Sequence, residues 1–255
     1  MDWGIAAAGL IVGFLVGLTG MGGGALTTPI LILIFHVRPV FAVGTDLVYG
    51  SITKWFGAAV HLRQGTVNKK LVRQLATGSI PATLLGVLVL RRLGITKATD
   101  HFITRALGLG LILIAIGLAI DVVLRRKRPG WVPGMTMPTD RPWLNAGVGA
   151  VVGFLLALTS IGSGTLIMAA LLTAYPGTRA AELVGSDVVH ASMLVTVAAL
   201  GHISIGTVEP RIVGSLLVGS IPGVLVGSRM TVRTPEAALR PILATVLLIS
   251  GVKLV

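Results

Sequence analysis

The sequence predicts an all-α polytopic membrane protein that consists of two homologous halves, each with a glycine-broken first helix. Hydrophobic residues make up 54% of the 255 positions and charged residues only 12%, and the mean hydropathy is +0.93. A soluble domain usually carries about a quarter charged residues, because its surface is wetted. Since a helix needs about 20 apolar residues to span a bilayer, a chain of this length suits about eight to ten crossings.

A basic, proline-rich stretch divides the apolar segments into two sets. Residues 125–142 begin with four consecutive basic residues and contain four prolines, a composition that is typical of a cytoplasmic loop. We therefore expect a first transmembrane repeat at residues 1–124, a linker at 125–142 and a second repeat at 143–255. The expected apolar segments lie near residues 5–20, 25–36, 40–61, 71–90, 104–124, 143–160, 164–175, 181–203, 212–230 and 238–255.

The second set of segments repeats the first at a nearly constant spacing. Asp46 in Val-Gly-Thr-Asp matches Asp187 in Val-Gly-Ser-Asp 141 positions later, and His61 matches His202 at the same spacing. The glycine-rich motif of the first half recurs 140 positions later. A constant shift that carries Asp, His, Gly and Pro together is not a chance recurrence of apolar residues. Duplicated halves are typical of secondary transporters, whose site lies near the bilayer midplane between the repeats.

The two repeated histidines lie near the ends of their segments. Each of His61 and His202 precedes a Gly-Thr-Val turn. Polar side chains are readily accepted at the membrane interface. We therefore expect these histidines to brace the turns or to lie at the interface, rather than to gate the pathway.

The distribution of basic loop residues favours five segments per half, and hence inverted repeats. Lys and Arg concentrate on the cytoplasmic side of a membrane protein. With five crossings per half, one side receives 13 basic residues and the other 7, whereas with four crossings the two sides nearly balance. Segments 25–36 and 164–175 hold only 12 residues each, about 18 Å of helix. We therefore expect both to be broken or re-entrant.

The two glycine motifs predict an anion-binding site. Residues 19–24 read Thr-Gly-Met-Gly-Gly-Gly and residues 159–164 read Thr-Ser-Ile-Gly-Ser-Gly. A backbone opened within lipid is tolerated only where it lines a cavity or is buried in protein. The half-helix that follows presents unpaired N–H groups and the positive end of its dipole, which bind anions. The alternative is that the glycines only permit close helix crossing. The predicted substrate-binding residues are Thr19, Gly22, Gly23, Gly24, Thr159, Ser160, Gly162, Ser163 and Gly164.

Three ionisable residues inside the apolar segments are candidates for proton coupling, because burial of such groups in a membrane is costly. Asp46 and Asp187 are related by the repeat, and His190 follows Asp187 by three residues on the same helical face. Either the carboxylates carry protons that set the affinity for an anion, or each caps a helix N-terminus. An Asp–His pair either relays protons or is purely structural. Lys54 lies mid-segment, where it pairs with an aspartate or attracts the anion.

Other classes of function find less support in the sequence. The net charge of +12 does not indicate nucleic acid binding, because the basic residues lie in short loops without accompanying aromatic residues. There is no cysteine, and no Gly-Lys-Ser/Thr motif for a nucleotide, so we expect no cofactor and no metal. An enzyme built on Ser186, Asp187 and His190 lacks a nucleophile elbow. The N-terminus has no basic region before its apolar run, so we expect a membrane segment there rather than a signal peptide.

At three places the chain resembles the TauE/SafE family of membrane transporters. These are the Gly-x-x-x-Gly-x-x-Gly-x-Gly-Gly-Gly pattern of residues 13–24 with Pro29 after it, the Pro-x-x-Ala-x-Gly-Thr pattern of residues 39–45, and His-x-x-x-Gly-x-Val at residues 61–67. The sequence differs from the family at Asp46 and Asp187, where a small polar residue more often follows the Thr. The resemblance implies a multi-pass protein of the bacterial inner membrane that exports sulfite or small organosulfonates without ATP.

We therefore expect a secondary transporter that exports a small sulfur-containing anion by alternating access, with proton coupling as an option. Import of the same anions is the alternative, and an anion channel or an intramembrane enzyme is less favoured. The expected partners are the anion and the lipid bilayer, without nucleic acid, and a homodimer stays open.

Overall fold

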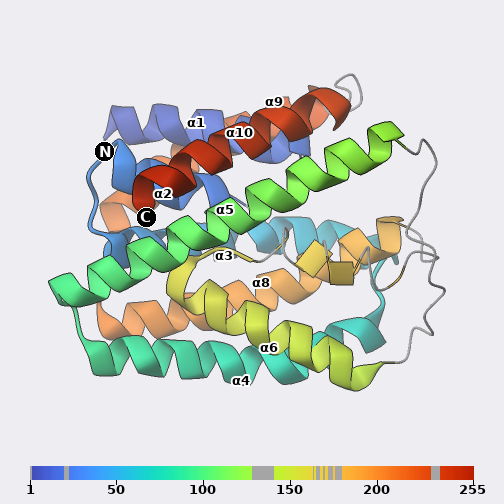
Figure 1. The fold of residues 1–255 in the computed structure, drawn as a ribbon, viewed down its shortest axis with the longest axis horizontal. Helices are drawn as coiled ribbons and strands as arrows, with labels where there is room; N and C mark the ends of the chain where they lie inside the picture. The colour runs from blue at the N-terminus through green and yellow to red at the C-terminus, as the bar shows by residue number, and fades with distance from the viewer. Residues whose placement is uncertain are drawn as a thin grey trace.

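The computed structural model describes residues 2–19, 23–127, 141–162, 164, 167–168, 170–171, 175, 180–230 and 236–255. Within these ranges the chain forms nine α-helices and no strand, which confirms the all-helical class (Figure 1). The helices are α1 (Trp3–Thr19), α2 (Gly24–Leu33), α3 (Pro39–Arg63), α4 (Lys69–Leu93), α5 (Lys97–Lys127), α6 (Pro142–Thr159), α8 (Ala180–Ile205), α9 (Pro210–Met230) and α10 (Glu236–Leu254).

The lengths and compositions of the helices suit a membrane. Five of them, α4, α5, α6, α8 and α9, are long and apolar enough to cross a bilayer, and α1, α2 and α10 are shorter apolar helices. Large apolar side chains such as Phe56, Leu113 and Ile221 are more than half exposed on the outer surface, as expected where lipid replaces water. α3 is 25 residues long but carries Asp46 and Lys54, which fits its position inside the bundle against α8.

The first helix of each half packs on the fourth helix of the other half. α1 lies along α9, and α6 lies along α4 (Figure 1). A Cβ on Gly13 of α1 would collide with the backbone of Ser220, and a Cβ on Gly153 of α6 would collide with that of Ser79. The two contacts are equivalent under the internal repeat. Glycines at these positions let the helix backbones approach closely, so part of each glycine-rich pattern serves helix packing.

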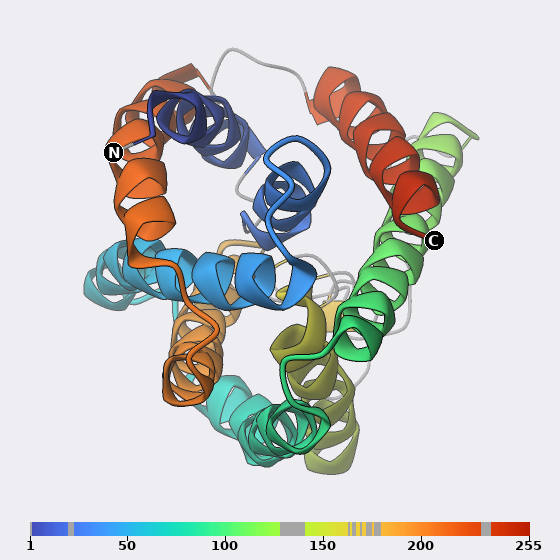
Figure 2. The same cartoon turned by 90° about the vertical axis from the view of Figure 1, so that its left-hand side faces the viewer.

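The equivalent helices α3 and α8 run antiparallel. Gly44 near the start of α3 meets Thr207 just after the end of α8, and Gly185 near the start of α8 meets Thr66 just after the end of α3. The last helices of the two halves, α5 and α10, also pack on each other, at one side of the bundle (Figure 2). Each of these pairs therefore consists of one helix from each half.

α2 is a short return segment between α1 and α3. Its 10 residues make about 15 Å of helix, too little to span a bilayer. α8 is antiparallel to α3, and α9 turns back from α8 through the loop 206–209, so α9 runs in the same direction as α3. α1 is parallel to α9, and α1 and α3 therefore also run in the same direction (Figure 1). The chain must return between them, and α2 does so. This agrees with the short segment predicted at 25–36, whereas much of 164–175 lies outside the described residues.

The end of α5 overlaps the start of the predicted linker. α5 continues through Lys127, so residues 125–127 are helical, and residues 128–140 lie outside the described part of the chain. Arg and Lys are good helix formers, which explains why a run of basic residues extends the helix. Pro142, the last residue of the predicted linker, occupies the first turn of α6.

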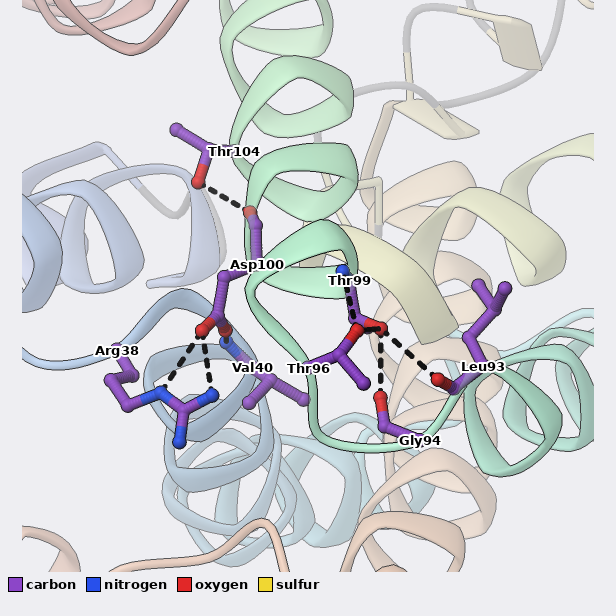
Figure 3. Close-up of polar contacts among 8 residues, drawn as sticks. All are labelled: Arg38, Val40, Leu93, Gly94, Thr96, Thr99, Asp100 and Thr104. Atoms are coloured by element: carbon purple, nitrogen blue, oxygen red, sulfur yellow. Dashed lines mark hydrogen bonds and ion pairs between the residues drawn. The ribbon is translucent and has the colours of Figure 1, made fainter.

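An ion pair joins the starts of α3 and α5. Arg38 donates from Nε and Nη2 to Oδ2 of Asp100, at 2.9 and 2.8 Å, and the backbone N–H of Val40 donates to Oδ1 at 3.2 Å (Figure 3). Asp100 therefore accepts hydrogen bonds from both the loop before α3 and its first turn. Half of the Arg38 side chain is exposed, so the pair lies at the rim of the bundle and not in its interior.

Candidate functional site

A buried carboxylate on α3 connects both glycine motifs. Asp46 is 2% exposed, and its Oδ2 accepts hydrogen bonds from the hydroxyls of Thr28 on α2, at 2.9 Å, and Ser160 after α6, at 2.6 Å. Its Oδ1 receives no hydrogen bond from the residues that the structure describes. α3 begins at Pro39, well before Asp46, so Asp46 does not cap the N-terminus of α3 itself.

The start of α2 and the end of α6 touch each other beside this carboxylate. α6 ends at Thr159, and Ser160 takes a left-handed conformation with φ 58°, which turns the chain out of the helix. A Cβ on Gly24, the first residue of α2, would collide with the backbone oxygen of Ser160 and lie 3.1 Å from Oδ2 of Asp46. Only glycine permits this approach. The structure therefore brings Gly24 and Ser160 together, whereas Gly23 faces Thr27 and Tyr49.

The other predicted anion-binding residues have different surroundings or lie outside the described part of the chain. The Thr159 hydroxyl donates to the carbonyl oxygen of Leu155 at 2.7 Å and accepts from the N–H of Ile161 at 3.2 Å, so in this conformation it caps its own helix. Gly162 and Gly164 have positive φ angles of 125° and 104°, consistent with a broken helix. Gly22, Ser163 and the side chain of Thr19 lie outside the described residues.

Asp187 and His190 are buried on α8, where they do not bond to each other. Asp187 is 4% exposed and His190 is 1% exposed. His190 Nε2 lies 2.8 Å from the hydroxyl of Ser79 on α4. Among the described residues, Oδ1 of Asp187 and Nδ1 of His190 have no hydrogen-bond partner. α8 begins at Ala180, so Asp187 is not the N-cap of its helix either.

The charged side chain of Lys54 lies near both buried aspartates. It interacts electrostatically with Asp187 and, less strongly, with Asp46, and also with His190. Because α3 and α8 are antiparallel, Lys54 lies between the levels of the two aspartates. Among the described residues, two buried carboxylates and the partly exposed Lys54 thus lie on the two equivalent helices.

The residues of the enzyme alternative are not arranged for nucleophilic catalysis. The Ser186 hydroxyl donates to the carbonyl oxygen of Glu182 at 2.7 Å and accepts from the backbone N–H of Asn68 at 2.8 Å. His190 instead contacts Ser79. A base that activates a serine must lie within hydrogen-bond reach of its hydroxyl, and these contacts give Ser186 the role of joining α8 to the start of α4.

The repeated histidines contact the turns that follow their helices. His61 Nδ1 lies 3.0 Å from the hydroxyl of Thr66, and His202 Nδ1 lies 2.8 Å from that of Thr207. His202 Nε2 additionally contacts the carbonyl oxygen of Ala157 at 2.9 Å. Both histidines therefore brace the turn after their helix, in agreement with the expectation from the sequence.

Two polar groups in the interior were not predicted from the sequence. Ser79 on α4 contacts His190 on α8. The sequence did single out the stretch around Ser79, because Gly78-Ser79-Ile80-Pro81 recurs in the second half as Gly219-Ser220-Ile221-Pro222. The second group is Asn145 on α6, which is 2% exposed. It accepts from the Tyr175 hydroxyl at 2.8 Å and donates to Gln74 at 2.8 Å.

Comparison with known proteins identifies the family. The family described as "Sulfite exporter TauE/SafE" matches residues 5–254. The "Probable membrane transporter protein YjnA" of Bacillus subtilis (strain 168) is 44% identical over 257 residues, which cover all of both chains. The "Probable membrane transporter protein YdhB" of the same organism is 28% identical over 90% of each chain. No solved structure matches the chain. The protein is therefore a membrane transporter and belongs to the TauE/SafE family.

Proposed function

We propose that the protein exports a small sulfur oxyanion or a short organosulfonate across a bacterial cell membrane by alternating access. The observation that carries the proposal is the meeting of the two glycine motifs in the interior. The start of α2 touches Ser160 of the second motif, and the hydroxyls of Thr28 and Ser160 point to one buried position, which Asp46 Oδ2 occupies. Two hydroxyl donors beside the start of a helix suit an anion.

The two halves are proposed to be inverted repeats. The antiparallel packing of α3 on α8 supports this arrangement, because equivalent helices point in opposite directions only if the halves are inverted. The parallel packing of α1 on α9 supports it as well, because halves of the same orientation would make these two helices antiparallel. In inverted-repeat transporters the substrate site lies where the repeats meet, at broken helices, and Gly24 and Ser160, one from each glycine motif, approach each other in the interior.

Charge balance supports coupling to protons through Asp46, Asp187 and His190. With both aspartates ionised and Lys54 protonated, the interior carries a net negative charge, and a bound anion increases it. Uncompensated charge in a medium of low dielectric constant is costly. A proton that enters with the anion offsets this increase, and the two buried carboxylates are the groups placed to accept it.

Uptake into proteoliposomes tests the substrate class. We expect saturable uptake of labelled sulfite or of a short sulfonate, above that of protein-free liposomes and dependent on an imposed pH gradient. Labelled sulfate, carried by the same vesicles, shows how strictly the site selects among sulfur oxyanions. If the protein transports another solute but no sulfur anion, the proposed substrate class is wrong.

Two further measurements separate the alternatives. Cells that express the protein retain less labelled sulfonate if it exports and accumulate more if it imports. Exchange of internal for external anion that saturates indicates a carrier, whereas single-channel currents indicate a channel.

A further inference from the structure

A second group of buried polar atoms lies on the other side of the interior, around His190. Nδ1 of His190 and Oδ1 of Asp187 have no hydrogen-bond partner among the described residues, although both side chains are more than nine-tenths buried. Buried polar atoms are almost always bonded to protein or to an ordered ligand or water. The unpartnered Nδ1 of His190 therefore indicates a place where something else binds, with the carboxylate of Asp187 on the neighbouring turn of α8.

The contact with Ser79 determines which nitrogen of His190 carries the proton. Ser79 is fully buried, and within the described residues its hydroxyl is bonded only to Nε2 of His190, at 2.8 Å. A buried O–H group without an acceptor is costly, so the hydroxyl donates to Nε2. A neutral imidazole that accepts at Nε2 holds its proton at Nδ1. The unpartnered atom is thus an N–H donor.

Lys54 lies at the same level of the bundle. A Cβ on Gly50 would contact Val195, and one on Gly57 would contact Val188. The stretch of α3 between these glycines, which holds Lys54, therefore lies beside the stretch of α8 that holds His190. The electrostatic interactions of Lys54 with Asp187 and with His190 agree with this position.

We propose that Lys54 and His190 form an oxyanion subsite on the transport pathway, in which the anion accepts hydrogen bonds from Lys54 Nζ and from the Nδ1–H of His190. Asp187 balances the charge of Lys54 while the subsite is empty, and Ser79 is a positioning residue that fixes the imidazole. The proposal rests on the proposed function, because it names the groups that receive the transported anion beyond the glycine motifs.

The other half of the repeat does not reproduce this subsite. Under the shift of 141 positions, Lys54 corresponds to Val195 and His190 to Tyr49. Tyr49 faces Ser220, the counterpart of Ser79. The two halves thus keep the same scaffold but place the ammonium and the imidazole on one side only, so each chain has one such subsite.

Binding of labelled sulfite and of a short alkyl sulfonate to the purified protein tests the proposal. Hydrogen bonds to charged groups correspond to about 10- to 100-fold in affinity, so we expect Lys54→Gln to weaken binding by roughly that factor and Lys54→Arg to keep part of it. Ser79→Ala should weaken binding severalfold, with partial rescue in Ser79→Thr. The matched control is Ser220→Ala, which removes the equivalent hydroxyl from the half without the histidine and should bind like the wild type.

A spectroscopic measurement distinguishes positioning by Ser79 from a structural role. In the ¹⁵N NMR spectrum of labelled histidine, the wild type should show His190 protonated at Nδ1, and Ser79→Ala should lose this single tautomer while Ser220→Ala keeps it. Wild-type affinity in both Lys54→Gln and Ser79→Ala, in protein that still transports sulfur anions, overturns the subsite and leaves the transport function intact. Failure of the wild type to move any sulfur anion overturns the transport function itself. If Lys54→Gln does not fold, the comparison of Ser79→Ala with Ser220→Ala still tests the subsite.

Discussion

Asp46 uses the two hydroxyls that a substrate anion would need. Its Oδ2 accepts from Thr28 and Ser160, so in the described conformation a carboxylate of the protein itself occupies the space between the donors. An ionised Asp46 both repels an incoming anion and holds these hydroxyls. A protonated Asp46 does neither, since the charge is gone and an acid oxygen is a weaker acceptor. We therefore expect binding of the anion and binding of a proton at this residue to favour each other.

Replacement of Asp46 by Asn tests this link. In the wild type we expect anion binding to strengthen as the pH falls, because each proton taken up by Asp46 removes the competing charge. The amide of Asp46→Asn is neutral at every pH, so this variant should bind at neutral pH as tightly as the wild type does in acid, with a flattened pH profile. The measurement is a binding titration of sulfite or a sulfonate at several pH values.

The control for this experiment is Asp100→Asn. Asp100 is paired with Arg38 at the rim of the bundle (Figure 3), apart from the interior carboxylates, and its replacement should leave the pH profile of binding unchanged. An unaltered pH profile in Asp46→Asn would mean that Asp46 has a structural role only.

The sequence was sufficient to find Asp46, Asp187 and His190, because charged residues stand out in apolar segments and recur with the repeat. It did not supply their partners. Ser79 meets His190, and Ser160 meets Asp46, across helices whose relative position depends on backbone packing. Asp187 and His190, three residues apart on α8, were candidates for a pair, but the imidazole bonds instead to Ser79 on the neighbouring helix α4.

At the scale of the helices, glycine decides which surfaces pack. Gly219 of α9 lies so close to α1 that a Cβ would collide with the backbone of Ala6, and Gly78 of α4 is placed in the same way against Ala146 of α6. Gly214, five residues earlier on α9, has open space around it. The sequence shows all these residues as glycines in apolar helices, so only the packing distinguishes the constrained ones from the others.

Paired substitutions within α9 test this difference. Gly219→Ala should destabilise the protein by about 1–3 kcal/mol, the usual cost of overpacking, and lower the Tm measured in detergent. Gly214→Ala should leave the stability unchanged or raise it by about 0.5–1 kcal/mol, because alanine is the better helix former. Gly78→Ala should behave like Gly219→Ala, since the contacts are equivalent. Equal effects at positions 214 and 219 would contradict the packing of α1 on α9.

At the scale of the whole molecule, the helices of the two halves are mixed throughout the bundle. Each of the pairs α1–α9, α4–α6, α3–α8 and α5–α10 combines one helix from each half (Figure 2). The two halves therefore cannot move apart as two rigid bodies, to open a site first to one side of the membrane and then to the other, without breaking these contacts. The units that move against each other must each contain helices from both halves.

Cysteine labelling tests the inverted arrangement. The chain contains no cysteine, so single substitutions give unambiguous labels. Gln64 after α3 and Ser204 at the end of α8 lie at nearly equivalent positions and are both exposed. In cells, a membrane-impermeant maleimide should label only one of Gln64→Cys and Ser204→Cys, because inverted repeats place them on opposite faces. Labelling of both, or protection of both, would favour parallel halves.

The packing of α1 on α9 also has a consequence for biosynthesis. α1 leaves the ribosome first, yet the helix that covers its glycine-lined face begins only at Pro210. Throughout insertion of the intervening helices, α1 must remain in the bilayer with that face uncovered. A nascent chain that terminates before α9 thus lacks the helix that covers this face of α1. Two half-length chains made together, in contrast, contain every helix needed to complete the pairs.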